Sequence, residues 1–262
     1  MFGITVLGSG SKGNSIVIHG KDGAILLDVG FSLRETRRRM AAAGVDDNAL
    51  SAILVSHEHT DHTKGLRVAA NHYRIPVYCN RGTGEILKQR EVEPERLHLF
   101  ATGNAFRVNE FTVEPFSLPH DAMDPVGFTV RSNGCKLGVV TDLGHVSHMV
   151  CHHLRECDIL VVESNHDMEM LNQSSRPWSL KQRIVSRHGH LSNQAGMELL
   201  KQILHERTRH VILAHASQDC NRYELAEACG AETLSACART DIQLQVARQD
   251  LGLASVWVED DT

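Results

Sequence analysis

Four side chains that bind divalent metals stand within six residues, in the segment SHEHTDH at positions 56 to 62. They are His57, His59, Asp61 and His62, and they directly follow the apolar run AILV, which predicts a buried strand. Because the chain leaves the sheet in a tight loop, the side chains of His57 and His59 can point toward one position, and those of Asp61 and His62 toward a second position nearby. The segment therefore predicts two adjacent metal sites at the end of a strand.

Other apolar runs in the sequence also end in a residue that can bind a metal. These residues are Asp28, His120, Asp142 and His215. Active sites of layered α/β proteins collect at strand ends, so we expect these side chains to meet along one edge of the sheets. One histidine in such a place is more often an ordinary core residue, but the whole set favours a metal centre.

With this set of residues the sequence resembles the metallo-β-lactamase superfamily. The HxHxDH motif of that family stands here as HEHTDH, and its later motifs match His120, Asp142 and His215 in order. The resemblance spans nearly the whole chain and implies an αββα sandwich, an α/β (α+β) fold. Asp28 matches the family's first motif, an aspartate that steadies the HxHxDH loop from behind the ligands.

The resemblance also implies how two metal ions are bound. It places one ion on His57, His59 and His120 and the other on Asp61, His62 and His215, with Asp142 as the bridge. A nitrogen and oxygen ligand set of this kind suits Zn²⁺ or Mn²⁺, with iron as an alternative. The expected mechanism is attack by a bridging hydroxide of lowered pKa, with Asp61 orienting it. Two divalent ions and two carboxylates give the site a charge of about +2, which favours an anionic substrate.

Two later stretches are similar to paired histidine motifs of the β-CASP nuclease branch of the superfamily. They are GHLSN at positions 189 to 193 and HAS at 215 to 217. The similarity implies that His190 contacts the scissile phosphate or the leaving group, and an imidazole at the start of a helix is well placed to meet an oxyanion. The alternative is a histidine that merely begins a helix.

Three stretches together resemble the YycJ/WalJ-like single-domain family of 5′-to-3′ DNA exonucleases. They are GSGSKGN at 8 to 14, ESNHD at 163 to 167, and GHLSN. The resemblance makes Ser11, Asn14, Asn165 and His166 candidate substrate contacts. The first stretch could cradle a phosphate through its amides, or be only a turn between strands.

The same resemblance bears on domain organisation and substrate. Only 72 residues separate Asp142 from His215, too few for an inserted β-CASP cap, so residues 1–262 are predicted to form one domain. The leading hypothesis is an exodeoxyribonuclease that acts on DNA, with RNA as an alternative substrate.

Other functions share parts of this pattern. A thioester or small-ester hydrolase of the glyoxalase II type uses the same metal motif and would not need His190. A flavodiiron-type protein replaces a first-motif histidine, whereas His59 is intact, and no flavin domain fits in this length. A regulatory protein with a silent metal site is the remaining alternative.

Two groups of basic residues could follow a nucleic-acid backbone, although such runs are more often solvated helix faces. They are Arg34, Arg37 and Arg38, and Lys181, Arg183 and Arg187.

Hydrophobic periodicity predicts the elements that must position these residues. Strands are expected at 4–7, 15–19, 24–28, 52–56, 76–79, 111–118, 126–131, 135–141, 159–163 and 211–214. Helices are expected at 33–43, where Ser32 and Glu35 have the spacing of a capping box, and at about 193–205. Gly20 to Gly23 reads as the turn of a hairpin.

Composition limits the class of protein. The chain has 262 residues, of which 42% are apolar, enough for one large core. Seven cysteines without a CxxC pair predict free thiols, and together with the absence of an export signal or membrane span they favour a soluble cytoplasmic protein. The formal charge of −5 means that nucleic-acid binding must depend on a local patch. The oligomeric state is not indicated.

Overall fold

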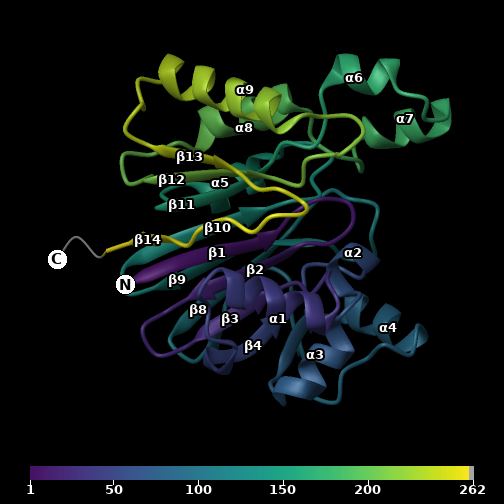
Figure 1. The fold of residues 1–262 in the computed structure, drawn as a ribbon, viewed down its shortest axis with the longest axis vertical. Coiled ribbons are helices and arrows are strands. Elements are labelled where there is room, and N and C mark those ends of the chain that lie inside the picture. Colours follow the sequence, from purple (N-terminus) through teal and green to yellow (C-terminus); the bar gives the residue numbers. More distant parts are fainter. Residues whose placement is uncertain (260–262) are drawn as a thin grey trace.

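Two seven-stranded sheets lie face to face, with helices covering the outer face of each (Figure 1). The structure is a computed structural model and describes residues 1–259. This arrangement confirms the αββα sandwich that the sequence predicts.

The first sheet is built from the N-terminal part of the chain and one late strand. Strands β14 to β3 are antiparallel to their neighbours, whereas β3 to β6 run parallel. In spatial order the strands are β14 (Val256–Val258), β1 (Phe2–Gly8), β2 (Ser15–His19), β3 (Ala24–Leu27), β4 (Leu50–Leu54), β5 (Val77–Asn80) and β6 (Leu97–Phe100).

The second sheet has the same design. Strands β7 to β10 are antiparallel, and β10 to β13 are parallel. In spatial order the strands are β13 (Gln243–Val246), β12 (His210–Ala214), β11 (Ile159–Glu163), β10 (Cys135–Val140), β9 (Val126–Ser132), β8 (Phe111–Ser117) and β7 (Phe106–Val108).

The helices divide between the two outer faces (Figure 1). The first sheet carries α1 (Leu33–Ala42), α2 (Thr60–Thr63), α3 (Leu66–Tyr73) and α4 (Arg81–Gln89), with a 3₁₀ turn at Asp47–Ala49. The second sheet carries α5 (His148–Leu154), α8 (Asn193–Ile203) and α9 (Tyr223–Ala236). Two short helices, α6 (Met168–Gln173) and α7 (Trp178–Ile184), stand together at one corner as a separate arm.

Apolar side chains fill three layers, as a four-layer sandwich requires. The central layer lies between the sheets and includes Phe2, Phe111 and Phe128, each at most 1% exposed. One outer layer packs α1, α3 and α4 on the first sheet, and the other packs α5, α8 and α9 on the second. The sheets are therefore fixed relative to each other, and so are the loops at their ends.

Local signals read from the sequence produce the elements expected. Ser32 caps α1 by accepting a hydrogen bond from the Glu35 amide, and Gly44 follows the helix with φ of 70°. The Gly20 amide donates to the Gly23 carbonyl and closes the β2–β3 hairpin. The expected strand at 24–28 ends one residue earlier, at Leu27, because Asp28 adopts a left-handed conformation with φ of 58°. The expected strand at 52–56 instead spans Leu50–Leu54.

All seven cysteines lie within the described residues and none forms a disulfide, in agreement with the thiols that the sequence predicts. Within residues 1–259, no helix combines the length and the apolar character that a membrane crossing needs.

The packing of the central layer allows a prediction about the free energy of unfolding. Phe128 is 1% exposed and meets Phe100 edge to face at 5.9 Å, so Phe128→Ala should lower the free energy of unfolding by about 3–5 kcal/mol through lost burial and an internal cavity. Val68→Ala, at a position that is 57% exposed, should change it by less than about 0.5 kcal/mol. Denaturant unfolding measures both, and equal losses would contradict the assignment of Phe128 to the core.

Candidate metal centre

Three strands end in polar residues that share an unusual backbone conformation. Asp28 follows β3, Asp142 follows β10 and His215 follows β12, with φ of 58°, 60° and 59° respectively. The left-handed region is rare outside glycine, although Asp and His enter it more often than bulky residues do. Each strand therefore turns sharply at its end and aims a ligand-type side chain into the space between the two sheets.

The HEHTDH segment begins just beyond β4 and is held from behind by Asp28. One carboxylate oxygen of Asp28 accepts from the Ser56 amide and the other from the Ser56 hydroxyl, each at 2.8 Å. Gly30 allows the segment to pass close by, because a Cβ there would lie 1.8 Å from the Asp61 carbonyl oxygen. Asp28 thus occupies the supporting position that the sequence predicts.

Four imidazoles of the centre are anchored through Nδ1. His62 contacts Asp28 at 2.7 Å, His57 the Ser56 hydroxyl at 3.0 Å, His120 the Gly189 carbonyl at 3.0 Å, and His215 a carboxylate oxygen of Glu163 at 2.9 Å. The Nε2 atoms of His57, His120 and His215 are buried without a hydrogen-bond partner. Buried unpaired nitrogens are costly, and a histidine ligand characteristically donates its other ring nitrogen to the protein.

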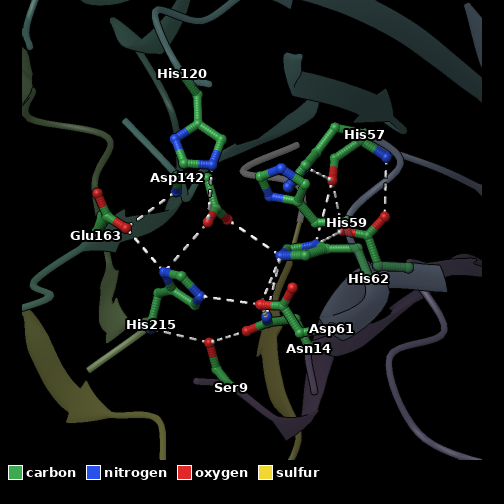
Figure 2. Close-up of polar contacts among 12 residues, drawn as sticks. Ser9, Asn14, His57, His59, Asp61, His62, His120, Asp142, Glu163 and His215 are labelled. Atoms are coloured by element: carbon green, nitrogen blue, oxygen red, sulfur yellow. Dashed lines mark hydrogen bonds and ion pairs between the residues drawn. The ribbon is translucent and has the colours of Figure 1, made fainter. Parts of the chain in front are cut away.

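The potential ligands converge in four overlapping groups, two of which match the sets expected (Figure 2), while the others join Asp142 to His57 and His62 and to Glu163, His190 and His215. In each group the donor atoms lie within 4.8 Å of one another: His57, His59 and His120 in one, and Asp61, His62 and His215 in another. Asp142 lies between them, with one oxygen 3.2 Å from His62 Nε2 and the other 3.7 Å from His120 Nε2. The seven predicted ligands are therefore brought together, and these residues fit divalent metal ions.

Buried carboxylates determine the charges of the histidines in the centre. Burial alone would lower the pKa of His62, but the carboxylates of Asp142 and Asp28 outweigh it and raise that pKa well above its usual range. The pKa of His215 is raised to about 10 against the same effect of burial, because Asp142 and Asp61 stabilise its charge. Burial lowers the pKa of His57 well below its usual range. The carboxylates of the centre thus strongly favour positive charge beside them.

Glu163 is a residue of the site that the sequence reading did not single out. It ends β11, is fully buried, and accepts from Nδ1 of both His190 and His215 at 2.9 Å. Its oxygens also accept from the Asp142, Leu143 and Leu191 amides. The signal that could have found it is the one that found Asp142, an apolar strand that ends in a carboxylate.

The candidate substrate contacts have different surroundings. Asn14 is buried, and its amide nitrogen lies 3.3 Å from Asp61 Oδ2 and 3.1 Å from His62 Nε2. Asn165 donates to the His215 carbonyl at 2.8 Å. His166 is 1% exposed, and neither ring nitrogen has a partner among the described residues. Ser11 is exposed at the tip of the N-terminal loop.

Most amides of that N-terminal loop bond within the protein. The amides of Ser9, Gly10, Lys12, Gly13 and Asn14 donate to acceptors elsewhere in the chain or in the loop itself. The Ser9 hydroxyl in turn accepts from the His215 amide at 2.9 Å. In this structure the loop therefore acts as a support for the centre.

His190 stands where the centre opens. Its ring lies 5.1 Å from that of His120 and 5.2 Å from that of His215, and its Nδ1 faces Glu163. Burial opposes its charge, yet Glu163 raises the pKa of His190 above its usual value. On its other side His190 lines a pocket of about 130 Å³ together with Ser11, Asn165, Ser217 and residues of the α6–α7 arm. His190 is therefore shared by the centre and this pocket.

A two-sheet sandwich with this donor set at the sheet ends defines a metal-dependent hydrolase of the metallo-β-lactamase fold. The family model described as the Beta-lactamase superfamily domain matches residues 24–216, and the chain belongs to that superfamily. It is 36% identical over 224 residues to Exodeoxyribonuclease YycJ of Bacillus anthracis, covering 85% of each chain. It is 33% identical over 229 residues to Exodeoxyribonuclease WalJ of Streptococcus pneumoniae, covering 86% of this chain and 85% of that one.

Solved structures share the fold over nearly the whole chain. The metallo-beta-lactamase fold protein YhfI from Bacillus subtilis superposes with a TM-score of 0.73 at 13% identity, covering 96% of this chain and 98% of that one. Zn²⁺-bound PqqB from Methylobacterium extorquens superposes with a TM-score of 0.70 at 17% identity, covering 96% and 99%.

Metal binding should release protons from this centre. At pH 7 His62 and His215 are protonated in the metal-free protein, because pH 7 lies below their raised pKa values, whereas a histidine ligand must be neutral. We expect a net release of protons at pH 7. The release should fall as pH rises toward the His215 pKa of about 10. Calorimetric titration with Zn²⁺ in buffers of different ionisation enthalpy counts the protons, and a heat that is the same in every buffer would contradict the prediction.

Glu163→Gln should weaken the metal site that contains His215. A carboxamide cannot accept from two imidazoles and three amides as the carboxylate does, so His215 loses its fixed orientation. Changes to such supporting residues reduce metal affinity by about 10–100-fold, and chelator competition measures the effect. The matched control is Glu169→Gln on the exposed face of α6, which should leave affinity unchanged. Equal affinity of all three proteins would show that Glu163 does not orient His215.

Proposed function

We propose that the chain is a 5′-to-3′ exodeoxyribonuclease with a dinuclear metal centre. The observation that carries the proposal is the convergence of two donor groups on either side of Asp142, with His190 beside them at the mouth of a pocket. The relatives named exodeoxyribonuclease, which match across most of the chain, support DNA as the substrate.

Two divalent ions, Zn²⁺ or Mn²⁺, would be held by the seven ligands of the centre. When bound, such ions supply Lewis acidity and a water of lowered pKa, which is the chemistry that phosphodiester hydrolysis needs. The residues that would hold them are His57, His59, Asp61, His62, His120, Asp142 and His215.

The protein's own side chains supply orientation and proton transfer. Asp61 is partly exposed, and its Oδ2 lies 3.6 Å from Nε2 of both His62 and His215, so its carboxylate can orient the attacking water. His190 is fixed by Glu163 through Nδ1, and its raised pKa favours the protonated ring. His190 is thus suited to stabilise the phosphate or to give a proton to the leaving oxygen.

His190 also distinguishes the proposed exodeoxyribonuclease from the alternative function, a thioester hydrolase of the glyoxalase II type. A simple ester hydrolase needs only the metal ligands, whereas here Glu163 holds His190 in the wall of the pocket beside the centre. That contact favours a substrate with an anionic group on the His190 side.

The proposed function predicts metal-dependent degradation from the 5′ end. The substrates are duplex DNAs labelled at the 3′ end, with either a 5′-phosphate or a 5′-hydroxyl, incubated with Mn²⁺ or Zn²⁺. Native protein should give a ladder of shortening labelled strands, because attack starts at the unlabelled end. The double variant His57→Ala, Asp142→Ala should give none, and the exposed-site control His72→Ala should match the native protein.

Two results would contradict the proposal. Immediate release of the label as a mononucleotide would show attack from the 3′ end. Intact DNA together with rapid turnover of an acyl-glutathione would assign the centre to thioesters.

A further inference from the structure

The α6–α7 arm carries a large aromatic side chain that does not pack into the hydrophobic core. Trp178 begins α7 and is 69% exposed, whereas Leu171 and Ile184 of the same arm are at most 7% exposed and pack with Cys220. The arm thus has a small core of its own, and Trp178 lies outside it. A solvent-exposed tryptophan side chain beside buried apolar neighbours is typical of a binding surface.

The arm is also basic in a protein that is acidic as a whole. Across the arm, residues 168–184, the chain has three basic residues and one acidic residue, Glu169, against a net charge of −5 overall, and Arg187 follows the arm. Arg176 pairs with Asp219 and Arg183 with Asp121, and these pairs fasten the arm to the body. Among residues 1–259, Lys181 and Arg187 form no ion pair, so their charge is available to a ligand.

The basic helix of the N-terminal half offers a contrast. Arg37 pairs with Asp47, and Arg38 pairs with Glu35 on the same helix. Arg34 forms no ion pair among the described residues, but the other two arginines of that group are neutralised by their neighbours, as on a solvated helix face. Two cations without an ion pair, Lys181 and Arg187, therefore lie on or next to the arm, against one on this helix.

The arm leads directly to the proposed active site. Its residues Arg176, Leu180 and Arg183 line the same pocket as His190 and Ser11. Trp178 and Lys181 are three residues apart on α7, so they share one face of the helix and place an aromatic ring beside a cation. An aromatic platform with adjacent cations is how proteins bind single-stranded nucleic acid, because bases stack on the ring and phosphates meet the charge.

We propose that the α6–α7 arm grips single-stranded DNA, with a base stacked on Trp178 and the backbone led past Lys181 toward His190. This inference rests on the proposed function, since it specifies that the end of a DNA strand, in a duplex or a single strand, is unpaired when it reaches that site. Bases of a duplex are stacked on each other, so a duplex offers its backbone to Lys181 but no free base face to Trp178.

The test measures binding without catalysis, in metal-free protein with a chelator present. The chain has two tryptophans, and the second, Trp257, lies in β14 on the opposite side of the molecule from α7 (Figure 1). In a Trp257→Phe protein, fluorescence therefore reports on Trp178. We expect quenching by an oligothymidylate of roughly ten nucleotides, and little quenching by an abasic oligomer of equal length or by a duplex.

Affinity provides the second readout. Trp178→Ala should weaken oligothymidylate binding roughly tenfold, Trp178→Phe should retain most of it, and duplex binding should not change. Unquenched fluorescence at saturation, or equal binding by Trp178→Ala and native protein, would overturn the proposal. Because no metal is present, a failure here is distinguishable from a lack of exonuclease activity, which the labelled-DNA assay measures separately.

Discussion

One buried carboxylate at the end of a strand in each sheet holds three of the imidazoles in and beside the centre in place. Asp28 from the first sheet fixes His62, and Glu163 from the second fixes His215 and His190. An imidazole held through Nδ1 can direct only Nε2 inward, so these contacts determine which atoms face the centre. The ligand geometry depends on them, because rotation of either ring would remove a donor from its group.

The two sheets bring these carboxylates together because they share a design. In each sheet parallel strands lie beside antiparallel ones, and the carboxyl ends of the parallel strands point to the same edge. The central layer of apolar side chains then fixes the two edges against each other. Burial between the sheets thus determines the spacing of ligands that are far apart in the sequence.

The sequence predicted the parts of the site whose signal is local. HEHTDH follows its strand directly, and Asp28, Asp142 and His215 each come at the end of an apolar run, so strand periodicity located them. Glu163 has the same local signal, but its partners His190 and His215 lie 27 and 52 residues away, and only the fold reveals them. The arm and strand β14 were not predicted because they are short and depend on distant partners. That residues 1–262 form one domain stays a prediction.

The N-terminal loop beside the centre is held by hydrogen bonds from a segment near residue 249 of the chain. Gln249 accepts from the Lys12 amide and donates to the Gly13 carbonyl, and β14 pairs with β1. During translation the metal ligands up to His215 emerge from the ribosome before Gln249 does. In a growing chain, all of the candidate ligands have therefore been synthesised while the loop that carries Asn14 still lacks its hydrogen bonds to Gln249. The hydrogen bonds that hold the finished loop therefore form only after all of the candidate ligands have been synthesised.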